Sequence, residues 1–340
     1  MSRRTPEETA DEPRVTPFEH LPTVARLAAP TTSEPRLLAA VSDPHVTPRA
    51  EGTPMVYHRS AERLATALDD AEARGVDAVV SPGDLTKDGA PREYDRLEGI
   101  LAGRETPLLA VPGNHDVPKA PVEEYEHGDD HETPPVERFA RLYAPDGSYP
   151  FVASVGDLDV VGLNTASEPD GSLETTHDGR VGADDLDWLA GALAEASNPV
   201  VLMHHNTPRM YDQFRAFRDQ TGSGMGLPPV MRDPAPLVDT LVDAGVRLVV
   251  TGHLHNLGVA ETGPVREVTT PATGSYPQGY LLFRLDRAGT VVKYVPVTDV
   301  EGMTEAHHAR ASAGTTSAGY AAFGAVRLAR LPLLEDEGGA

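Results

Sequence analysis

The sequence predicts an α/β protein built on a largely parallel sheet. Short apolar runs suited to buried strands recur along the chain, and each is followed by a loop rich in Asp, Asn, Gly or His. Amphipathic stretches with helical spacing separate many of these runs. The repeated order of strand, polar loop and helix is typical of βαβ units, whose active groups collect at the carboxyl ends of the strands.

The first regular element is expected after Pro35, because residues 1–34 mix Pro, Thr, Glu and Ala without periodicity and are typical of an N-terminal tail. Pro44 keeps the loop after the first strand out of a helix, and Gly75 ends the first helix. The expected strands are residues 37–41, 78–81 and 108–111, and the expected helices are residues 60–74 and a segment that begins at Pro91.

Residues 117–149 interrupt this order and are expected to form a solvated insertion loop; a lid or an accessory metal site is the alternative. The acidic and imidazole side chains that suggest such a site are Glu123, Glu124, Glu126, His127, Asp129, Asp130 and His131.

The βαβ order resumes in the second half of the chain, followed by a final hairpin. The expected elements are a hairpin of residues 151–155 and 158–163, helices at 183–196 and 236–245, strands at 200–203 and 247–250, and a hairpin of 281–285 and 291–295. Residues 209–233 lack the Gly-Lys-Ser/Thr ending of a phosphate-binding loop and are expected to form a mobile flap. With no repeat and no second core, we predict one domain over residues 35–311 and a C-terminal extension over 312–340 that holds a short helix at 321–331.

Charge and cysteine content exclude several classes of function. A net charge of -23 disfavours general nucleic-acid binding, and the absence of cysteine leaves only oxygen and imidazole groups as metal ligands. Lys87, Lys119 and Lys293 are the only lysines among 29 basic residues, which favours a salt-tolerant acidic shell over an acidic interaction surface. Arg3 and Arg4 are not followed by an apolar run, and no run is long enough to span a membrane, so we expect a soluble, cytoplasmic protein. The sequence is silent on its oligomeric state.

Metal-ligating side chains follow five predicted strands. They are Asp43 and His45, Asp84, Asn114 and His115, His204, and the pair His253 and His255. Single residues of these types are commonly turn or capping residues, but the ordered set is more specific. Two cations about 3.5 to 4 Å apart need one bridging carboxylate together with neutral imidazole and amide ligands. His253 and His255 alternate by two, which in an extended segment places both on one face.

These blocks read D-x-H, G-D, G-N-H-D, a later H and G-H-x-H, and over residues 36–286 the chain resembles the calcineurin-like metallophosphoesterase superfamily. The resemblance implies a β-sandwich of two mixed sheets flanked by helices, in αββα layers. It implies two divalent ions (Mn, Fe, Zn or Co), with Asp43, His45 and His255 on one, Asn114, His204 and His253 on the other, and Asp84 between them. The implied reaction is attack of a hydroxide shared by both metals on a phosphate ester.

Three further residues have expected roles. The resemblance makes His115 the group that steadies or protonates the leaving oxygen, with Asp116 orienting its ring or acting only as a loop cap. His205 follows a proposed ligand and is expected to fix His204 or to touch the substrate. The family often continues H-H-P-P, whereas Asn206 and Thr207 follow here. Surface positions are expected for His58, His177, His307 and His308.

The motifs also favour one branch of the superfamily. Protein phosphatases carry Asp-Arg-Gly after the second block, and purple acid phosphatases place a tyrosine where Lys87 stands. Residues 83–86 and 112–116 look most like the cyclic-nucleotide phosphodiesterase-like group, which implies a small phosphodiester substrate. The alternatives are a DNA-repair-type nuclease, which the acidic charge disfavours, and a non-catalytic scaffold on the same fold, which usually lacks ligands that are present here.

Overall fold

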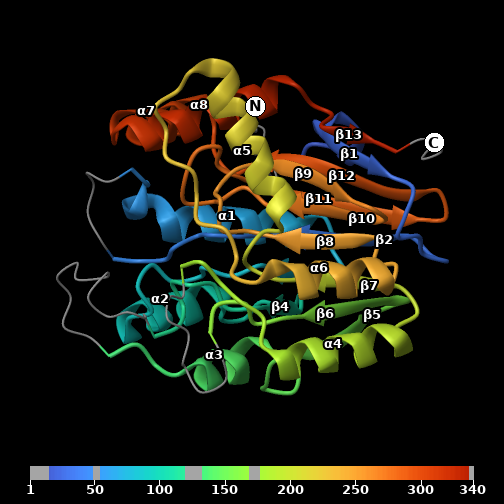
Figure 1. The fold of residues 1–340 in the computed structure, drawn as a ribbon. Coiled ribbons are helices and arrows are strands. Elements are labelled where there is room, and N and C mark those ends of the chain that lie inside the picture. Colours follow the sequence, from blue (N-terminus) through green and yellow to red (C-terminus); the bar gives the residue numbers. More distant parts are fainter. Residues whose placement is uncertain (1–14, 49–53, 119–131, 168–176, 337–340) are drawn as a thin grey trace, which may run out of the picture.

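Two mixed β-sheets pack face to face with helices on their outer faces, as the computed structural model shows for residues 15–48, 54–118, 132–167 and 177–336 (Figure 1). The first sheet has the order β13 (Leu334–Glu335), β1 (Thr23–Leu27), β12 (Gly289–Pro296), β11 (Gly279–Asp286), β2 (Arg36–Ala40), β3 (Ala78–Ser81) and β4 (Leu108–Ala110). The second has the order β5 (Phe151–Val155), β6 (Leu158–Gly162), β7 (Pro199–Leu202), β8 (Leu248–Thr251), β10 (Val265–Thr269) and β9 (Gly258–Thr262). The predicted αββα layers are confirmed.

The main core lies between the sheets. Leu38 and Val80 from the first sheet pack in one buried cluster with Val160, Val200 and Val250 from the second. These residues come from short, mostly apolar runs, as expected for strands that are covered on both faces. The runs that lead to the predicted ligands are parallel, β2 with β3 and β4, and β6 with β7 and β8.

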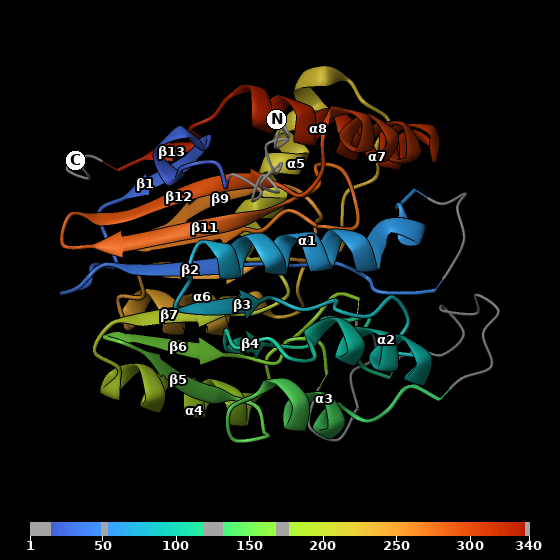
Figure 2. The same ribbon diagram turned by 180° about the vertical axis from the view of Figure 1, so that it is seen from behind.

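Helices form the outer layers, and a hydrophobic cluster lies between each sheet and the helices that cover it. The first sheet is covered by α1 (Ser60–Ala73), α2 (Pro91–Leu101) and α3 (Val136–Tyr143), and the second by α4 (Ala183–Glu195) and α6 (Pro234–Asp243). Figure 2, which views the molecule from the opposite side, shows α1 lying along the first sheet. At one end of the sandwich, α5 (Pro208–Thr221), α7 (Val300–Ser312) and α8 (Thr315–Ala329) group together. In the described part of the chain, no helix is both long and apolar enough to cross a bilayer.

Regular structure begins earlier than the sequence pattern predicts. Residues 1–34 were expected as a tail, but Thr23–Leu27 forms β1, which pairs with β12 and with β13 near the C-terminus. The strand is short, and its pairing partners are far away in the sequence, so periodicity could not reveal it. Strands β9 and β10 and helix α7 were also absent from the sequence prediction.

The predicted flap at residues 209–233 is wrong over its first half. Residues 208–221 form α5, whose Met210 and Phe214 are buried against Phe323 of α8. Gly222, at a φ of 65°, ends the helix in the left-handed conformation that glycine tolerates. The helix predicted at 321–331 is the longer α8. Within 117–149, residues 136–143 form α3, and the acidic and imidazole residues from Glu123 to His131 lie outside the described residues.

Candidate metal centre

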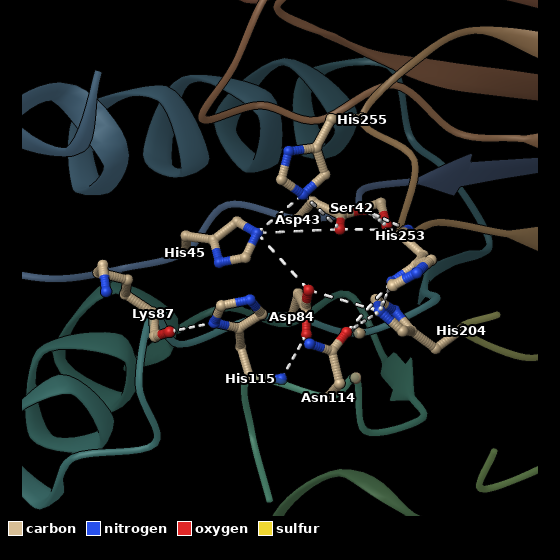
Figure 3. A network of polar contacts seen from close by, with 12 residues as sticks. Ser42, Asp43, His45, Asp84, Lys87, Asn114, His115, His204, His253 and His255 are labelled. Atoms are coloured by element: carbon tan, nitrogen blue, oxygen red, sulfur yellow. Dashed lines mark hydrogen bonds and ion pairs between the residues drawn. The ribbon is translucent and has the colours of Figure 1, made fainter. Parts of the chain in front are cut away.

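The predicted ligands converge at the carboxyl ends of β2, β3, β4, β7 and β8 (Figure 3). Each parallel strand delivers one loop to the same edge of the sandwich, so residues about 200 positions apart become neighbours. Most of these side chains are buried, with Asp43 and His204 at 0% and Asp84 at 1% relative exposure, whereas His253 and His255 are partly exposed. Burial of ionisable side chains is unfavourable unless hydrogen-bond partners or opposite charges compensate for the loss of water.

One group of ligand side chains comes from the loops after β2 and β8. His45 Nε2 lies 3.0 Å from His255 Nε2, and His255 Nε2 lies 3.1 Å from Asp43 Oδ1. With Asp84, these residues form a four-residue cluster able to hold a metal ion. These are the residues that the family resemblance implies for the first metal and the bridge.

A second group comes from the loops after β4, β7 and β8. Asn114 Oδ1 lies 3.0 Å from His204 Nε2 and 3.1 Å from His253 Nδ1, and the two histidine nitrogens are 3.2 Å apart. His205 also offers a nitrogen to this group, within 4.8 Å of those of His204 and His253.

Asp84 lies between the two groups. Its Oδ2 is 3.6 Å from His45 Nε2 on one side and 3.4 Å from His204 Nε2 on the other. Its Oδ1 accepts a hydrogen bond from the His115 backbone nitrogen at 2.8 Å, which fixes the carboxylate in this orientation. Gly113 leaves the necessary room, because a Cβ there would lie 2.1 Å from Asp84 Oδ1.

The backbone at the site is unusual. In the described residues, six non-glycine residues have a positive φ, and five are proposed ligands: Asp43, His45, Asp84, His253 and His255. This left-handed conformation disfavours residues with a Cβ and persists where surrounding structure enforces it. The loops are therefore held so that alternate side chains turn toward one another.

The donor set fits cations. A carbonyl only accepts hydrogen bonds, so His204 Nδ1, 2.8 Å from Pro82 O, must carry a proton, and its Nε2 can present a lone pair to the cleft. That nitrogen faces the Asn114 and Asp84 oxygens, which are also electron-rich. Electron-rich nitrogen and oxygen atoms this close together repel one another unless a proton or a cation lies between them.

The pKa values reflect the same crowding. Burial alone would raise the pKa of Asp84, but the neighbouring imidazoles of His204, His115 and His45 outweigh it and hold that pKa well below its usual range. Burial alone would lower the pKa of His204, but the charge and hydrogen bond of Asp84 raise it to about 9. Burial lowers the pKa of His45 and His253. Neutral imidazoles and ionised carboxylates are the forms that bind metal, so an ion held by His204 has to displace a proton from that ring.

His115 lies beside the metal-ligand cluster, and its ring contacts that of His45 edge to face at 4.7 Å between centroids. Its Nδ1 lies against the Lys87 carbonyl oxygen, so Nδ1 carries a proton and Nε2 is the ring's proton-exchanging atom. This differs from the expectation that Asp116 orients the ring.

The Asp116 carboxylate instead holds the loop after β3. It accepts hydrogen bonds from the backbone nitrogens of Leu85, Thr86 and Gly113 at 2.8 to 3.2 Å, and from the Thr86 hydroxyl. Burial and the negative charge of Asp84 raise the pKa of Asp116 to about 6. Asp116 therefore ties the Asp84 loop to the Asn114 loop, which is the loop-cap alternative.

His205 is buried, and its Nδ1 lies 2.8 Å from the Thr165 hydroxyl. Its Nε2 has no hydrogen-bond partner among the described residues. His177, expected at the surface, is exposed, yet its ring lies 5.5 Å from that of His253. His307 and His308 are exposed as expected, and His58 is partly buried against Glu305.

Sequence reasoning missed two supports of the site. Glu267 of β10 is buried and accepts hydrogen bonds from Asn206, Thr207 and Thr251, so the two residues that depart from H-H-P-P anchor the loop after His205. Arg310 of α7 donates to the carbonyl oxygens of His255 and Tyr276. The polar pair Asn206 and Thr207 was a signal in the sequence for the Glu267 network. Nothing in the local sequence indicates the role of Arg310.

Comparison with known proteins agrees with this geometry. A family model described as calcineurin-like phosphoesterase matches residues 37–257. The chain belongs to this family. Curated relatives include a probable cyclic nucleotide phosphodiesterase from Synechococcus, 26% identical over 67% of this chain and 79% of the relative. Another is the 3′,5′-cyclic adenosine monophosphate phosphodiesterase CpdA from Pseudomonas aeruginosa, 26% identical over 79% of this chain and 88% of the relative.

Among solved structures, a dimetal phosphatase from Danio rerio shares the fold, with a TM-score of 0.59 and 14% identity over 78% of this chain and 97% of that one. This likeness confirms the predicted fold, and the family model confirms the predicted superfamily. This calcineurin-like phosphoesterase is a metal-dependent hydrolase with candidate sites for two ions.

Proposed function

We propose that the chain hydrolyses a small phosphodiester, with a 3′,5′-cyclic nucleotide as the substrate class. The observation that carries the proposal is Asp84 Oδ2, which lies between two converging ligand groups, within 3.6 Å of His45 Nε2 and 3.4 Å of His204 Nε2. The names of the two relatives given above support the choice of a cyclic nucleotide.

Asp43, His45 and His255 would hold one ion, and Asn114, His204 and His253 the other, with Asp84 shared. Bound there, the ions would neutralise negative charge on the phosphoryl oxygens and make water a stronger nucleophile. In this proposal the ester lies beside His115, whose Nε2, when protonated, hands a proton to the leaving oxygen. Mn, Fe, Zn and Co are all compatible with these ligands. We also propose a cytoplasmic location for the protein.

The test is hydrolysis of cyclic AMP and of bis(4-nitrophenyl) phosphate by protein loaded with each metal in turn, with metal content measured by mass spectrometry. We expect close to two ions per chain and turnover well above that of the free metal ions. Activity no greater than that of the free ions, in protein that carries its metals, would refute the proposal.

The first prediction concerns Asp84→Asn. Because a carboxylate shared by both groups is lost, metal affinity should fall more than about a hundredfold, beyond the usual effect of an outer residue, and activity should fall with it. Asp95→Asn, at an exposed position of α2, is the matched control and should change neither. Titration of the metal-free protein measures the affinity, and full metal binding by Asp84→Asn would remove Asp84 from the bridge.

A further inference from the structure

A pocket of about 430 Å³ adjoins the candidate metal centre on the side of the C-terminal helices. Its walls come from Pro54 and Met55, from Ser275, from Arg310, and from a segment called here the α7–α8 turn. This segment comprises Ala313 and Gly314, which connect the two helices, together with residues 315–317 and Tyr320 of α8. The volume falls within the range of about 300 to 1,000 Å³ typical of small-molecule sites.

The pocket and the candidate metal centre share one residue. His255 directs Nε2 toward His45 and Asp43, while the residue also lines the pocket. A phosphate held at the ligand cluster would therefore have the pocket directly beside it. Whatever is esterified to that phosphate on this side must enter the pocket or be excluded from it.

The lining combines apolar surface with hydroxyl groups. Met55 and the Tyr320 ring offer flat or adaptable apolar contact, and Ser275 with the threonines and serine of the α7–α8 turn offers hydroxyls. Tyr320 is itself held, since its ring packs edge to face on Phe214 at 5.3 Å between centroids. This mixture suits a planar heterocycle that carries a sugar.

The pocket also carries a positive charge. Arg310 is only 4% exposed, and its guanidinium lies 5.7 Å from the centre of the Tyr320 ring. The hydrogen bonds that it donates to His255 and Tyr276 go to uncharged carbonyl oxygens, which leave its positive charge in place. On a chain with a net charge of -23, this cation favours a ligand that is anionic as a whole, such as a nucleotide whose phosphate lies at the adjoining metal centre.

We propose that this pocket binds the nucleoside part of the substrate, so that the α7–α8 turn determines which phosphodiesters are hydrolysed efficiently. The proposal rests on the phosphodiesterase function proposed above and adds the recognition of the group beyond the phosphate. It assigns a binding role to the segment after residue 311, which the sequence pattern treated as an extension.

The experiment fills the pocket and compares two substrates. Ala313→Trp and Ser317→Trp place a large ring in the pocket from its wall, and Val326→Trp, at a position of α8 that is 43% exposed and does not line the pocket, is the matched control. The kcat/KM of each metal-loaded variant is measured for cyclic AMP and for methyl 4-nitrophenyl phosphate, which has no nucleoside.

For both filling variants, we expect the ratio of kcat/KM for cyclic AMP to that for the small diester to fall about tenfold or more, chiefly through KM. Val326→Trp should leave the ratio unchanged. Two filling positions guard against one variant that fails to fold, and metal content is checked for each.

The two proposals fail in different ways. If the wild-type protein hydrolyses neither substrate, the phosphodiesterase function fails. If the wild-type protein hydrolyses both and the filling variants lower both equally or lower neither, the pocket does not bind the nucleoside.

Discussion

At the scale of single residues, His115 is distinguished from the ligands around it by its hydrogen bonding. Its Nδ1 is committed to the Lys87 carbonyl oxygen, and its backbone nitrogen holds Asp84, so its ring can serve proton transfer while its main chain serves the metal-ligand cluster. The side chain and the main chain of one residue thus have separable roles.

Replacement of His115 by Ala keeps the backbone nitrogen and removes only the ring. We expect the variant to retain both metals and to lose about 10² to 10⁴ in kcat, the usual contribution of a positioned acid or base. Metal analysis and steady-state kinetics measure the two effects. His308→Ala, at an exposed position of α7, is the control, and metal loss in His115→Ala equal to that in Asp84→Asn would make His115 a ligand instead.

Glu267 is a second residue whose chemistry can be isolated. Burial raises its pKa despite the hydrogen bonds it accepts from Thr207, Asn206 and Thr251. A raised pKa means that the folded state binds the proton more tightly than the unfolded state, so this stabilisation is present below the unfolded value of 4.5 and is lost as the pH rises through the folded pKa.

Glu267→Gln replaces one acceptor by a donor facing other donors, which should cost about 1 to 3 kcal/mol of unfolding free energy. Because the variant has no titrating group at this position, the amount by which the wild type exceeds it in unfolding free energy should be greatest in acid and smaller at neutral pH. Urea unfolding from pH 4 to 8 measures it. Glu261→Gln on β9 is the exposed control, and a difference independent of pH would show that Glu267 does not titrate in this way.

At the scale of elements, α7 supports the loop after β8. Arg310 donates to the carbonyl oxygens of His255 and Tyr276, and its other nitrogen lies 3.4 Å from the Leu254 carbonyl oxygen. His253 and His255 have positive φ values of 68° and 50°, and such a backbone persists only when its surroundings enforce it. The helix therefore contributes to the candidate centre without supplying a ligand.

Removal of this support by Arg310→Met should lower the unfolding free energy by at least about 2 kcal/mol, because charged donors to buried carbonyls are lost. It should also weaken binding of the ion assigned to His255 more than that of the other. Denaturant unfolding and metal titration test both effects. Arg330→Met, exposed at the end of α8, is the control, and two equally weakened metal sites would argue for a general loss of stability.

At the scale of the whole molecule, the net charge of -23 opposes the compact state through self-repulsion. The screening length falls from about 10 Å at 0.1 M salt to about 3 Å at 1 M, so added salt should stabilise the protein, with about 2 to 4 °C in Tm for each kcal/mol regained.

Thermal unfolding in sodium chloride and in sodium sulfate of matched ionic strength tests this origin. Screening depends on ionic strength, whereas exclusion from the protein surface favours sulfate. We expect similar rises in Tm in both salts. A rise in sulfate alone would assign the effect to solvent exclusion and weaken the expectation of a surface adapted to salt.

The sequence alone determined much of the frame, because each parallel strand is a short local pattern with a loop at its end. The strands at residues 37–41, 78–81 and 200–203 were predicted to within one residue at each end, and the loops after them carry Asp43, Asp84 and His204. Local signals of this kind depend on neighbours in the chain and survive without knowledge of the fold.

Only the tertiary structure decided what those loops are held by. The pairing of β1 with β12, the contact of Arg310 with His255, and the Glu267 network join residues that are far apart in sequence and lack a local pattern. The role of Asp116 belongs here too, because its carboxylate had two possible partners and packing selected the backbone of the Asp84 loop. Which groups meet across a folded chain is set by packing, and packing is a property of the whole molecule.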